Sequence, residues 1–340
     1  MICSMPISRP CRPVSVCQVS DSRKGTSLNA KEKLQEFTRH HDLGDISWSD
    51  ELAQVPSPSW WASDNVLIKG ESERFGPVLA KVMSRHAWSW RNRYNTFAAA
   101  TAAGEIGIAP VVHATDAETG VVLTERLTNG WRVARLDYYA DPDFRARLVK
   151  AREDFRGLDI ELSPRSPLVD VIHLLDECED RGIAVDARVL AMIDRLKSFT
   201  DVLLEYRKNL ELRPSQGEAT SSNLMVNDAG DLRIVGWGSA AKLSRVHDAA
   251  LLVAEATPTV LDARSLIGEL LPDASAKDVA VTMVVAVLEH LRWALLTTLR
   301  ARTDPDDTLD SVKYGLWHMT LAQVAMNDTH WTTQVEEALA

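Results

Sequence analysis

The chain has 340 residues, of which 45% are hydrophobic and 25% are charged. This length is enough for two packed lobes, and this composition excludes a wholly disordered chain. The formal net charge of −10 and the lack of a basic patch in the sequence argue against nucleic-acid and membrane-surface partners. The longest apolar runs, such as Val279 to Leu288, are too short to cross a bilayer. We therefore expect a cytoplasmic protein of two lobes.

Residues 1–45 are expected to form a flexible tail with one short helix. The tail is rich in Ser, Pro and Arg, and Ala30 to His40 has a helix-forming composition. Three of the four cysteines, Cys3, Cys11 and Cys17, lie here at spacings that fit no common zinc site. After the tail, a stretch that contains several Trp and Pro residues, 48–61, is predicted to be a connector.

The next part of the chain, residues 46–130, is expected to form a small lobe with an antiparallel sheet. Short apolar runs at 65–70 and 77–83 flank a polar turn, which indicates a hairpin. Residues 87–104 are rich in Ala and carry aromatic residues at helical spacing. Two further strands are predicted within 107–127. The predicted order is therefore strand, strand, helix, strand, strand.

Residues 131–340 are expected to form a larger, mainly helical lobe. The apolar spacing there is helical over 143–156, 167–181, 186–210, 251–271, 276–302 and 311–327. One island, Ser222 to Ala240, instead has two short strand-like runs around a turn. The predicted fold class is α+β, with a small mixed lobe followed by a helical lobe that contains one hairpin. This is the layout of the protein-kinase-like fold.

The segment 214–240 contains a pattern of polar residues at defined spacing. It has Gln216-Gly217-Glu218, four further residues, Asn223 with an apolar pair, a hairpin turn, and a strand that ends in Gly236-Trp237. This pattern resembles the catalytic segment of the aminoglycoside phosphotransferases and choline kinases, which reads His-Gly-Asp, four residues, Asn, a hairpin, and Asp-Trp or Asp-Phe. Downstream, Asp248 matches the buried structural Asp of these relatives.

The resemblance implies a nucleotide site between the lobes, with ATP as the cofactor. Lys81 stands where relatives have a strand lysine that grips the nucleotide phosphates, and Thr124 and Glu125 lie in a segment that resembles the hinge beside the adenine. Ser63 and Asn65 belong to the turn before the first strand of the hairpin. Relatives have glycine in this turn, where backbone N–H groups approach phosphate, whereas this chain has two tryptophans and an aspartate.

The catalytic segment departs from the pattern of the family at three positions. Gln216 replaces the His, Glu218 replaces the Asp that accepts the substrate proton, and Gly236 replaces the Asp that holds magnesium. The resemblance leaves Glu218 as a weakened base, with a solvated loop glutamate as the alternative. It leaves Asn223 as the remaining catalytic and metal-binding residue. Magnesium binding is in doubt because its main anionic ligand is missing.

The helix that follows the hairpin departs as well. Tyr94 and Thr96 stand where relatives have a glutamate that pairs with the strand lysine, so we expect Lys81 to lack that counter-ion. The role of Lys81 is either phosphate contact or that of a surface lysine. Asp231 cannot replace the metal ligand, because it lies roughly 16 Å back along the strand at about 3.3 Å per residue.

Several aromatic and histidine residues of the helical lobe are weaker candidates. His290, Trp293, Trp317 and His318 either line an acceptor cleft that suits an amine or simply pack between helices. His247 is interpreted as a loop histidine whose hydrogen bonds are satisfied.

The interpretation that we favour is a catalytically degenerate member of this family, a pseudokinase, that binds a nucleotide or small molecule in the interlobe cleft. The first alternative is an active ATP-dependent phosphotransferase that acts on a small hydroxylated or amine-bearing molecule. The second is a scaffold that binds a protein partner, which a cleft filled by Trp60 or Trp61 would favour.

Overall fold

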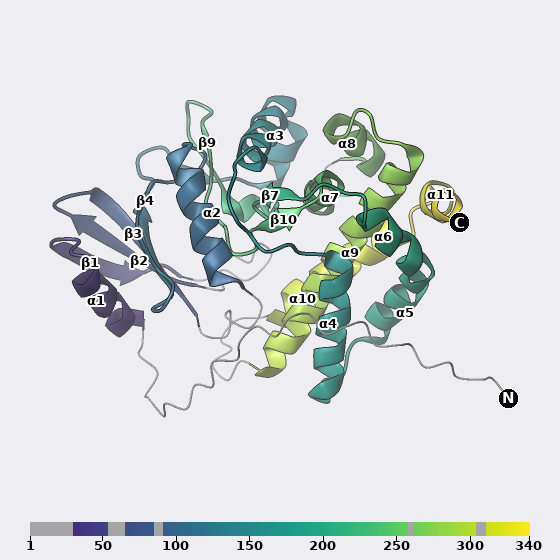
Figure 1. Cartoon of the computed structure of the whole chain (residues 1–340), viewed down its shortest axis with the longest axis horizontal. Helices are drawn as coiled ribbons and strands as arrows, with labels where there is room; N and C mark the ends of the chain where they lie inside the picture. The colour runs from purple at the N-terminus through teal and green to yellow at the C-terminus, as the bar shows by residue number, and fades with distance from the viewer. Residues whose placement is uncertain (1–29, 54–64, 85–90, 258–260, 304–310) are drawn as a thin grey trace.

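The computed structural model describes residues 30–53, 65–84, 91–257, 261–303 and 311–340 of the chain. Within these ranges the protein has two lobes, a small one built on a sheet and a larger helical one (Figure 1). This arrangement confirms the predicted α+β, kinase-like fold class. The candidate residues and regions outside the described ranges are Ser63, Trp60, Trp61 and the three N-terminal cysteines.

The small lobe contains a five-stranded sheet in the order β1-β2-β3-β5-β4. Its strands are β1 (Ile46–Glu51), β2 (Asn65–Ser72), β3 (Gly76–Met83), β4 (Val112–Asp116) and β5 (Val121–Glu125). The antiparallel pairing of β2 with β3 confirms the predicted hairpin. The prediction of a connector from residue 48 was wrong for β1, in which Trp48 pairs with Gly70. Ile46 and Trp48 alternate along β1 and pack against the core of this lobe.

Helix α1 (Ala30–His40) belongs to the small lobe. Its Leu34 and Phe37 are buried together with Ile68, Val78 and Leu123 of the sheet. Because Leu34 and Phe37 lie on one face of the helix, the sheet can cover both at once. The predicted helix at Ala30 to His40 is confirmed, and it packs on the sheet instead of lying in a flexible tail.

Helix α2 (Arg93–Glu105) joins the two lobes. It begins later than the predicted residue 87, because the Asn92 side chain accepts hydrogen bonds from the first-turn N–H groups and caps the helix. Its buried alanines, such as Ala99 and Ala103, pack in the core of the large lobe. Asn95 Nδ2 also donates to the Ala240 carbonyl at 3.0 Å. The start of α2 is thereby held against the segment 214–240.

The large lobe is built around one long buried helix, α9 (Ala276–Thr303). Its other helices are α3 (Pro142–Arg156), α4 (Pro167–Asp180), α5 (Ala187–Leu196), α6 (Thr200–Arg207), α7 (Arg245–Ala256), α8 (Ala263–Leu270), α10 (Ser311–Met326) and α11 (Glu337–Leu339). By length and composition α9 could cross a membrane, but 94% of its most apolar window is buried inside the fold. Val279 to Leu288 thus lies in a helix of the core.

Two predicted helices are interrupted. The predicted helix 186–210 is divided into α5 and α6 by a 3₁₀ turn, within which Ser198 Oγ donates to the Arg195 carbonyl at 3.0 Å. The predicted helix 251–271 is divided into α7 and α8, and α8 begins where the Asp262 side chain accepts a hydrogen bond from Ser265 N.

Short strands in the large lobe present the segment 214–240 to the small lobe. They are β6 (Arg132–Val133), β7 (Arg213–Ser215), β8 (Leu224–Val226), β9 (Leu232–Ile234) and β10 (Ala241–Leu243). The pairing of β8 with β9 confirms the predicted hairpin, and β7 pairs with β10.

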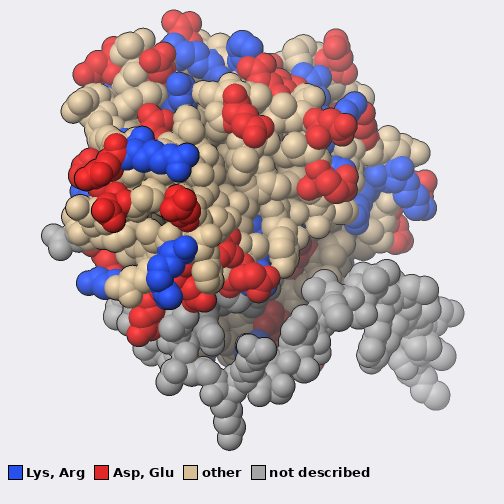
Figure 2. All heavy atoms as spheres, turned by 60° about the vertical axis from the view of Figure 1, so that its left-hand side comes forward, with Lys and Arg blue, Asp and Glu red and all other residues tan. Residues whose placement is uncertain are grey.

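Figure 2 shows one face of the molecule, on which acidic and basic side chains are interspersed.

Candidate functional site

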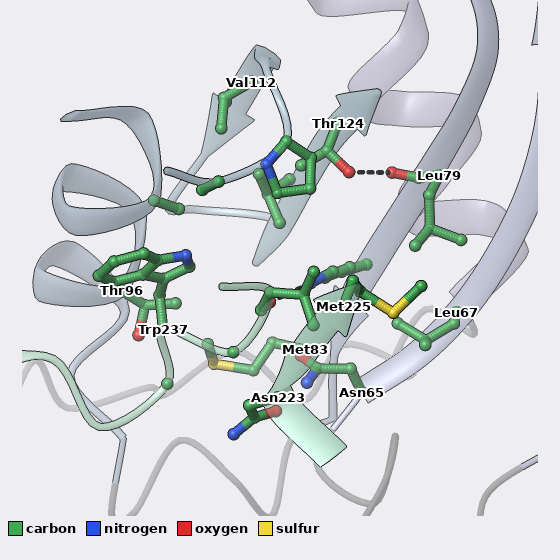
Figure 3. Close-up of a pocket in the computed structure, with 18 of the residues that line it drawn as sticks. Asn65, Leu67, Leu79, Met83, Thr96, Val112, Thr124, Asn223, Met225 and Trp237 are labelled. Carbon is green, nitrogen blue, oxygen red and sulfur yellow. Dashed lines mark hydrogen bonds between the residues drawn. The ribbon is translucent and has the colours of Figure 1, made fainter. Parts of the chain in front are cut away.

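A cavity of about 280 Å³ lies between the two lobes. Strands β2, β3 and β5 form one side of it, and residues 218–238 form the other. Its apolar lining includes Leu67, Leu79, Met83, Val112, Met225 and Trp237 (Figure 3). The candidate residues that line it are Asn65, Lys81, Thr124, Glu125, Glu218 and Asn223. The structure therefore brings these six candidate residues to one cavity, although binding by them stays a prediction.

A buried ion pair holds the loop that carries Glu218. Arg152 of α3 donates to both carboxylate oxygens of Asp248, at 3.1 and 2.8 Å. The same guanidinium donates to the backbone carbonyl of Glu218 at 2.7 Å, and Ser215 Oγ donates to Asp248. Asp248 is 7% exposed, as expected for a structural aspartate. Sequence reasoning missed Arg152, which lies far from the loop in the sequence.

The loop also depends on Gly217. This residue has φ +79°, and a Cβ on it would collide with the Ser239 carbonyl. Gln216, which replaces the His of the family, donates from Nε2 to the Gly236 carbonyl. Its Oε1 accepts a hydrogen bond from Glu218 N at 3.1 Å. The glutamine thus ties the loop to the strand end that follows it.

Glu218 is buried and has no free carboxylate oxygen. Arg91 Nη1 at 2.5 Å and Ser239 Oγ both donate to Oε1, and Asn223 Nδ2 donates to Oε2 at 2.7 Å. The alternative of a solvated loop glutamate is therefore wrong. A substrate hydroxyl would have to displace one of these donors before Glu218 could accept its proton. Arg91 was missed because it stands just before α2, at no catalytic position of the family.

The Asn223 side chain fills the position of the missing metal ligand. A Cβ built on Gly236 would lie under 3.0 Å from the Asn223 amide, closer than real Cβ atoms come. Asn223 Nδ2 donates to Glu218 and, at 2.9 Å, to Thr220 Oγ1. Among the described residues, no group of three or more His, Cys, Asp or Glu side chains could hold a metal ion. Magnesium beside a nucleotide is held by one or two carboxylates together with substrate phosphates, and position 236 supplies no such carboxylate, so the residues at this position do not fit the ion.

Lys81 of β3 reaches the opposite lobe. Its Nζ donates to the Val235 carbonyl at 2.5 Å, and burial lowers the pKa of the ammonium group to about 8. In the described part of the chain, no carboxylate pairs with it. Tyr94 is 61% exposed, and Thr96 Oγ1 donates to the Asn92 carbonyl. Lys81 thus lacks the counter-ion of the family, as predicted, and the surface-lysine alternative is wrong.

We expect Lys81→Met to change the pH dependence of stability. Below pH 8 both states hold the proton, and the folded protein bears the cost of the buried charge. Between pH 8 and 10.5 the folded state releases this proton first, so the unfolded state binds more protons and wild-type stability rises with pH. Relative to Lys81→Met, the wild-type free energy of unfolding should rise by about 1–3 kcal/mol between about pH 7 and 10 in urea titrations. A constant difference would contradict the burial of this charge.

Thr124 and Glu125, the residues expected at the hinge, both form hydrogen bonds with neighbouring strand or loop backbone. Thr124 Oγ1 donates to the Leu79 carbonyl at 3.3 Å (Figure 3), and Glu125 accepts a hydrogen bond from Val111 N at 3.3 Å. These contacts fix the edge of β5 at the cavity.

A second cavity, of about 30 Å³, also borders Glu218. His290, Trp293 and His318 line it, and the Nδ1 atoms of the two histidines are 2.9 Å apart. Burial lowers the pKa of His290 to about 4 and holds the pKa of His318 well below its usual value, so both rings are neutral near pH 7. Trp317 is 39% exposed and does not line this cavity. The three buried residues, His290, Trp293 and His318, pack between helices, and the binding of an acceptor molecule by them stays a prediction.

His247 lies in the first turn of α7 and not in a loop. Its Nε2 bonds to the Glu289 carboxylate at 3.0 Å, and Arg292 donates to the other oxygen of that carboxylate at 2.8 Å. The predicted satisfied histidine is confirmed, while its predicted location was wrong.

No protein-family model matches this sequence, and no curated protein matches it. Solved structures do match. A choline/ethanolamine kinase family protein from Mesorhizobium loti is 15% identical, with a TM-score of 0.68 over 90% of this chain and 99% of that chain. The choline kinase LicA from Streptococcus pneumoniae is 13% identical, with a TM-score of 0.65 over 88% and 99% of the two chains. An aminoglycoside 2'-phosphotransferase-IIIa mutant is 12% identical, with a TM-score of 0.60 over 88% and 99%.

These neighbours define the class of fold. The chain has the two-lobed, kinase-like fold of the choline kinases and aminoglycoside phosphotransferases, which confirms the resemblance seen in the sequence. At these identities the likeness establishes the fold.

Proposed function

We propose that this protein binds a nucleotide or a related small molecule in the interlobe cavity and does not carry out magnesium-dependent phosphoryl transfer. The observation that carries the proposal is the Asn223 amide, which stands where a side chain at position 236 would hold the metal. Phosphoryl transfer depends mainly on positioning and on charge neutralisation around the moving group. A cleft without a metal site lacks a large part of that neutralisation.

The pairing of Glu218 with Arg91 supports the loss of transfer. The carboxylate that would accept the substrate proton already neutralises a buried guanidinium. Removing Arg91 from it would leave a buried unpaired charge, which is costly. Glu218 is therefore better suited to holding the loop than to acting as a base.

The cavity itself supports ligand binding. It is lined mainly by apolar side chains with a few polar groups, which is typical of small-molecule sites. Two structural neighbours were solved with nucleotides: LicA in complex with AMP and the aminoglycoside 2'-phosphotransferase-IIIa mutant in complex with GDP. By analogy with these proteins, we propose a nucleotide as the ligand of this chain.

Thermal unfolding with ADP or ATP tests the proposal. A ligand that binds only the folded state adds about 2.7 kcal/mol of stability at 100 times its dissociation constant. We expect the nucleotide to raise the melting temperature in EDTA, and we expect no phosphoryl transfer when magnesium is added. As a control, Val112→Trp, which places a bulky ring in the cavity lining, should abolish the shift.

The same experiment separates the alternatives. A shift that requires magnesium, together with transfer to a small hydroxylated or amine-bearing molecule, would establish an active phosphotransferase. No shift with either nucleotide would favour a scaffold that binds a protein partner.

A further inference from the structure

Two lysines lie on the cavity side of the small-lobe sheet. In the antiparallel register of β2 with β3, Leu67 is opposite Lys81 and Lys69 is opposite Leu79. Opposite residues, and residues two apart along a strand, point to the same face of a sheet. All four of these side chains line the interlobe cavity. Lys69 and Lys81 are thus diagonal neighbours, a relation in which side chains start roughly 7–8 Å apart.

Neither lysine is neutralised within the described part of the chain. The other two cations that line the cavity have carboxylate partners, since Arg91 pairs with Glu218 and Arg126 pairs with Glu71. The described residues contain no ion pair of Lys69 or Lys81. The sheet side of the cavity therefore presents two positive charges without a negative partner.

The opposite side of the cavity lacks the carboxylate that would hold a metal ion against the negative charge of a polyphosphate. Gly236 has no side chain, and Asn223 occupies its surroundings. Lys81 Nζ meanwhile lies 2.5 Å from the carbonyl of Val235, the residue directly before Gly236. An ammonium group thus stands beside the place where relatives would hold their cation.

We propose that Lys69 and Lys81 form a phosphate-binding site for a nucleoside diphosphate that binds as its free anion, and that Mg²⁺ weakens this binding. The inference rests on the proposed function in requiring that the cavity binds a nucleotide. Two long, flexible lysine side chains that start from diagonal positions of one sheet face can both reach a diphosphate, and the apolar lining suits the base. Mg²⁺ bound to the diphosphate removes negative charge and brings a cation toward two lysines, so the metal complex binds less well.

Isothermal titration calorimetry on the full chain tests this inference. The ligands are ADP and adenosine, each in EDTA and in excess Mg²⁺, and the variants are Lys69→Met and Lys81→Met. The control is Lys150→Met on α3, which removes the same charge at a surface pair with Asp154 outside the cavity. We expect each cavity variant to weaken ADP binding about tenfold or more in EDTA. Adenosine binding should stay unchanged in all variants, and Mg²⁺ should weaken ADP binding to the wild type.

Each other outcome has a distinct meaning. Stronger ADP binding with Mg²⁺, or ADP binding that neither lysine variant weakens, would overturn the inference. Equal affinities for ADP and adenosine would also overturn it, while the cavity would remain a ligand site. If neither ligand binds, the nucleotide proposal itself fails. Unchanged adenosine binding shows that the cavity of each variant is folded, so a loss of ADP binding cannot be assigned to misfolding.

Discussion

Gly236→Asp is expected to destabilise the protein by about 1–3 kcal/mol and to leave it without magnesium-dependent transfer. The new Cβ would collide with the Asn223 amide, and that amide is held by Glu218 and Thr220. The added carboxylate therefore cannot take the position of a metal ligand unless Asn223 moves. The measurements are urea unfolding and a transfer assay with ATP and Mg²⁺.

Two further variants distinguish the collision with Asn223 from the general effect of replacing a glycine by an aspartate. Gly268→Asp introduces the same side chain on α8, where a Cβ would meet nothing within 4 Å, so it should change the stability little. Asn223→Ala combined with Gly236→Asp removes the obstructing amide and should recover part of the lost stability. A Gly236→Asp protein as stable as the wild type, with a magnesium-dependent rise in melting temperature, would show that the metal position is open.

Asp248→Ala is expected to lower the free energy of unfolding by about 3–5 kcal/mol, the largest effect that we predict for a single substitution. It leaves Arg152 buried without its carboxylate, although Arg152 still contacts the loop through the Glu218 carbonyl. Burial alone would raise the pKa of Asp248, but Arg152 and Arg156 outweigh burial and hold the pKa below its usual value. The stabilisation should therefore be present at neutral pH and be lost on acidification.

An exposed ion pair supplies the matched comparison for Asp248. Arg145 pairs with Glu269 through a similar fork, but the Glu269 side chain is 40% exposed. Glu269→Gln should therefore cost less than about 1 kcal/mol. Replacing both buried partners, as in Arg152→Met with Asp248→Leu, should cost less than Asp248→Ala alone, because no charge is left unpaired. Equal losses for the buried and exposed pairs in urea unfolding would contradict the role of burial.

The interlobe cavity shows how far residue spacing can predict a site. Local patterns predicted three features of the site: the hairpin of β2 and β3, the hairpin of β8 and β9, and the interval between Glu218 and Asn223. They could do so because strands and turns depend on near neighbours in the sequence. The resemblance carried by these patterns selected Asn65, Lys81, Thr124, Glu125, Glu218 and Asn223, and all six line one cavity. It also identified position 236 as the point where a metal ligand is absent.

Contacts between distant segments were beyond the reach of these patterns. Helix α1 packs on one face of the small-lobe sheet. The amphipathic pattern of α1 predicts that it buries one face, but it does not reveal which surface receives that face. Arg91, Arg152 and Lys69 were overlooked for the same reason, since an arginine or lysine in a sequence is most often a solvated surface residue. Their partners lie on other elements of the fold.

The sequence by itself determined the kinase-like order of elements and the replacement of Asp by Glu at 218 and by Gly at 236. Only the tertiary structure decided what these replacements mean. It surrounds Glu218 with Arg91, Ser239 and Asn223, and it fills the space beside Gly236 with an amide. The physical reason is that the availability of a carboxylate or of an empty position depends on the groups that folding brings next to it.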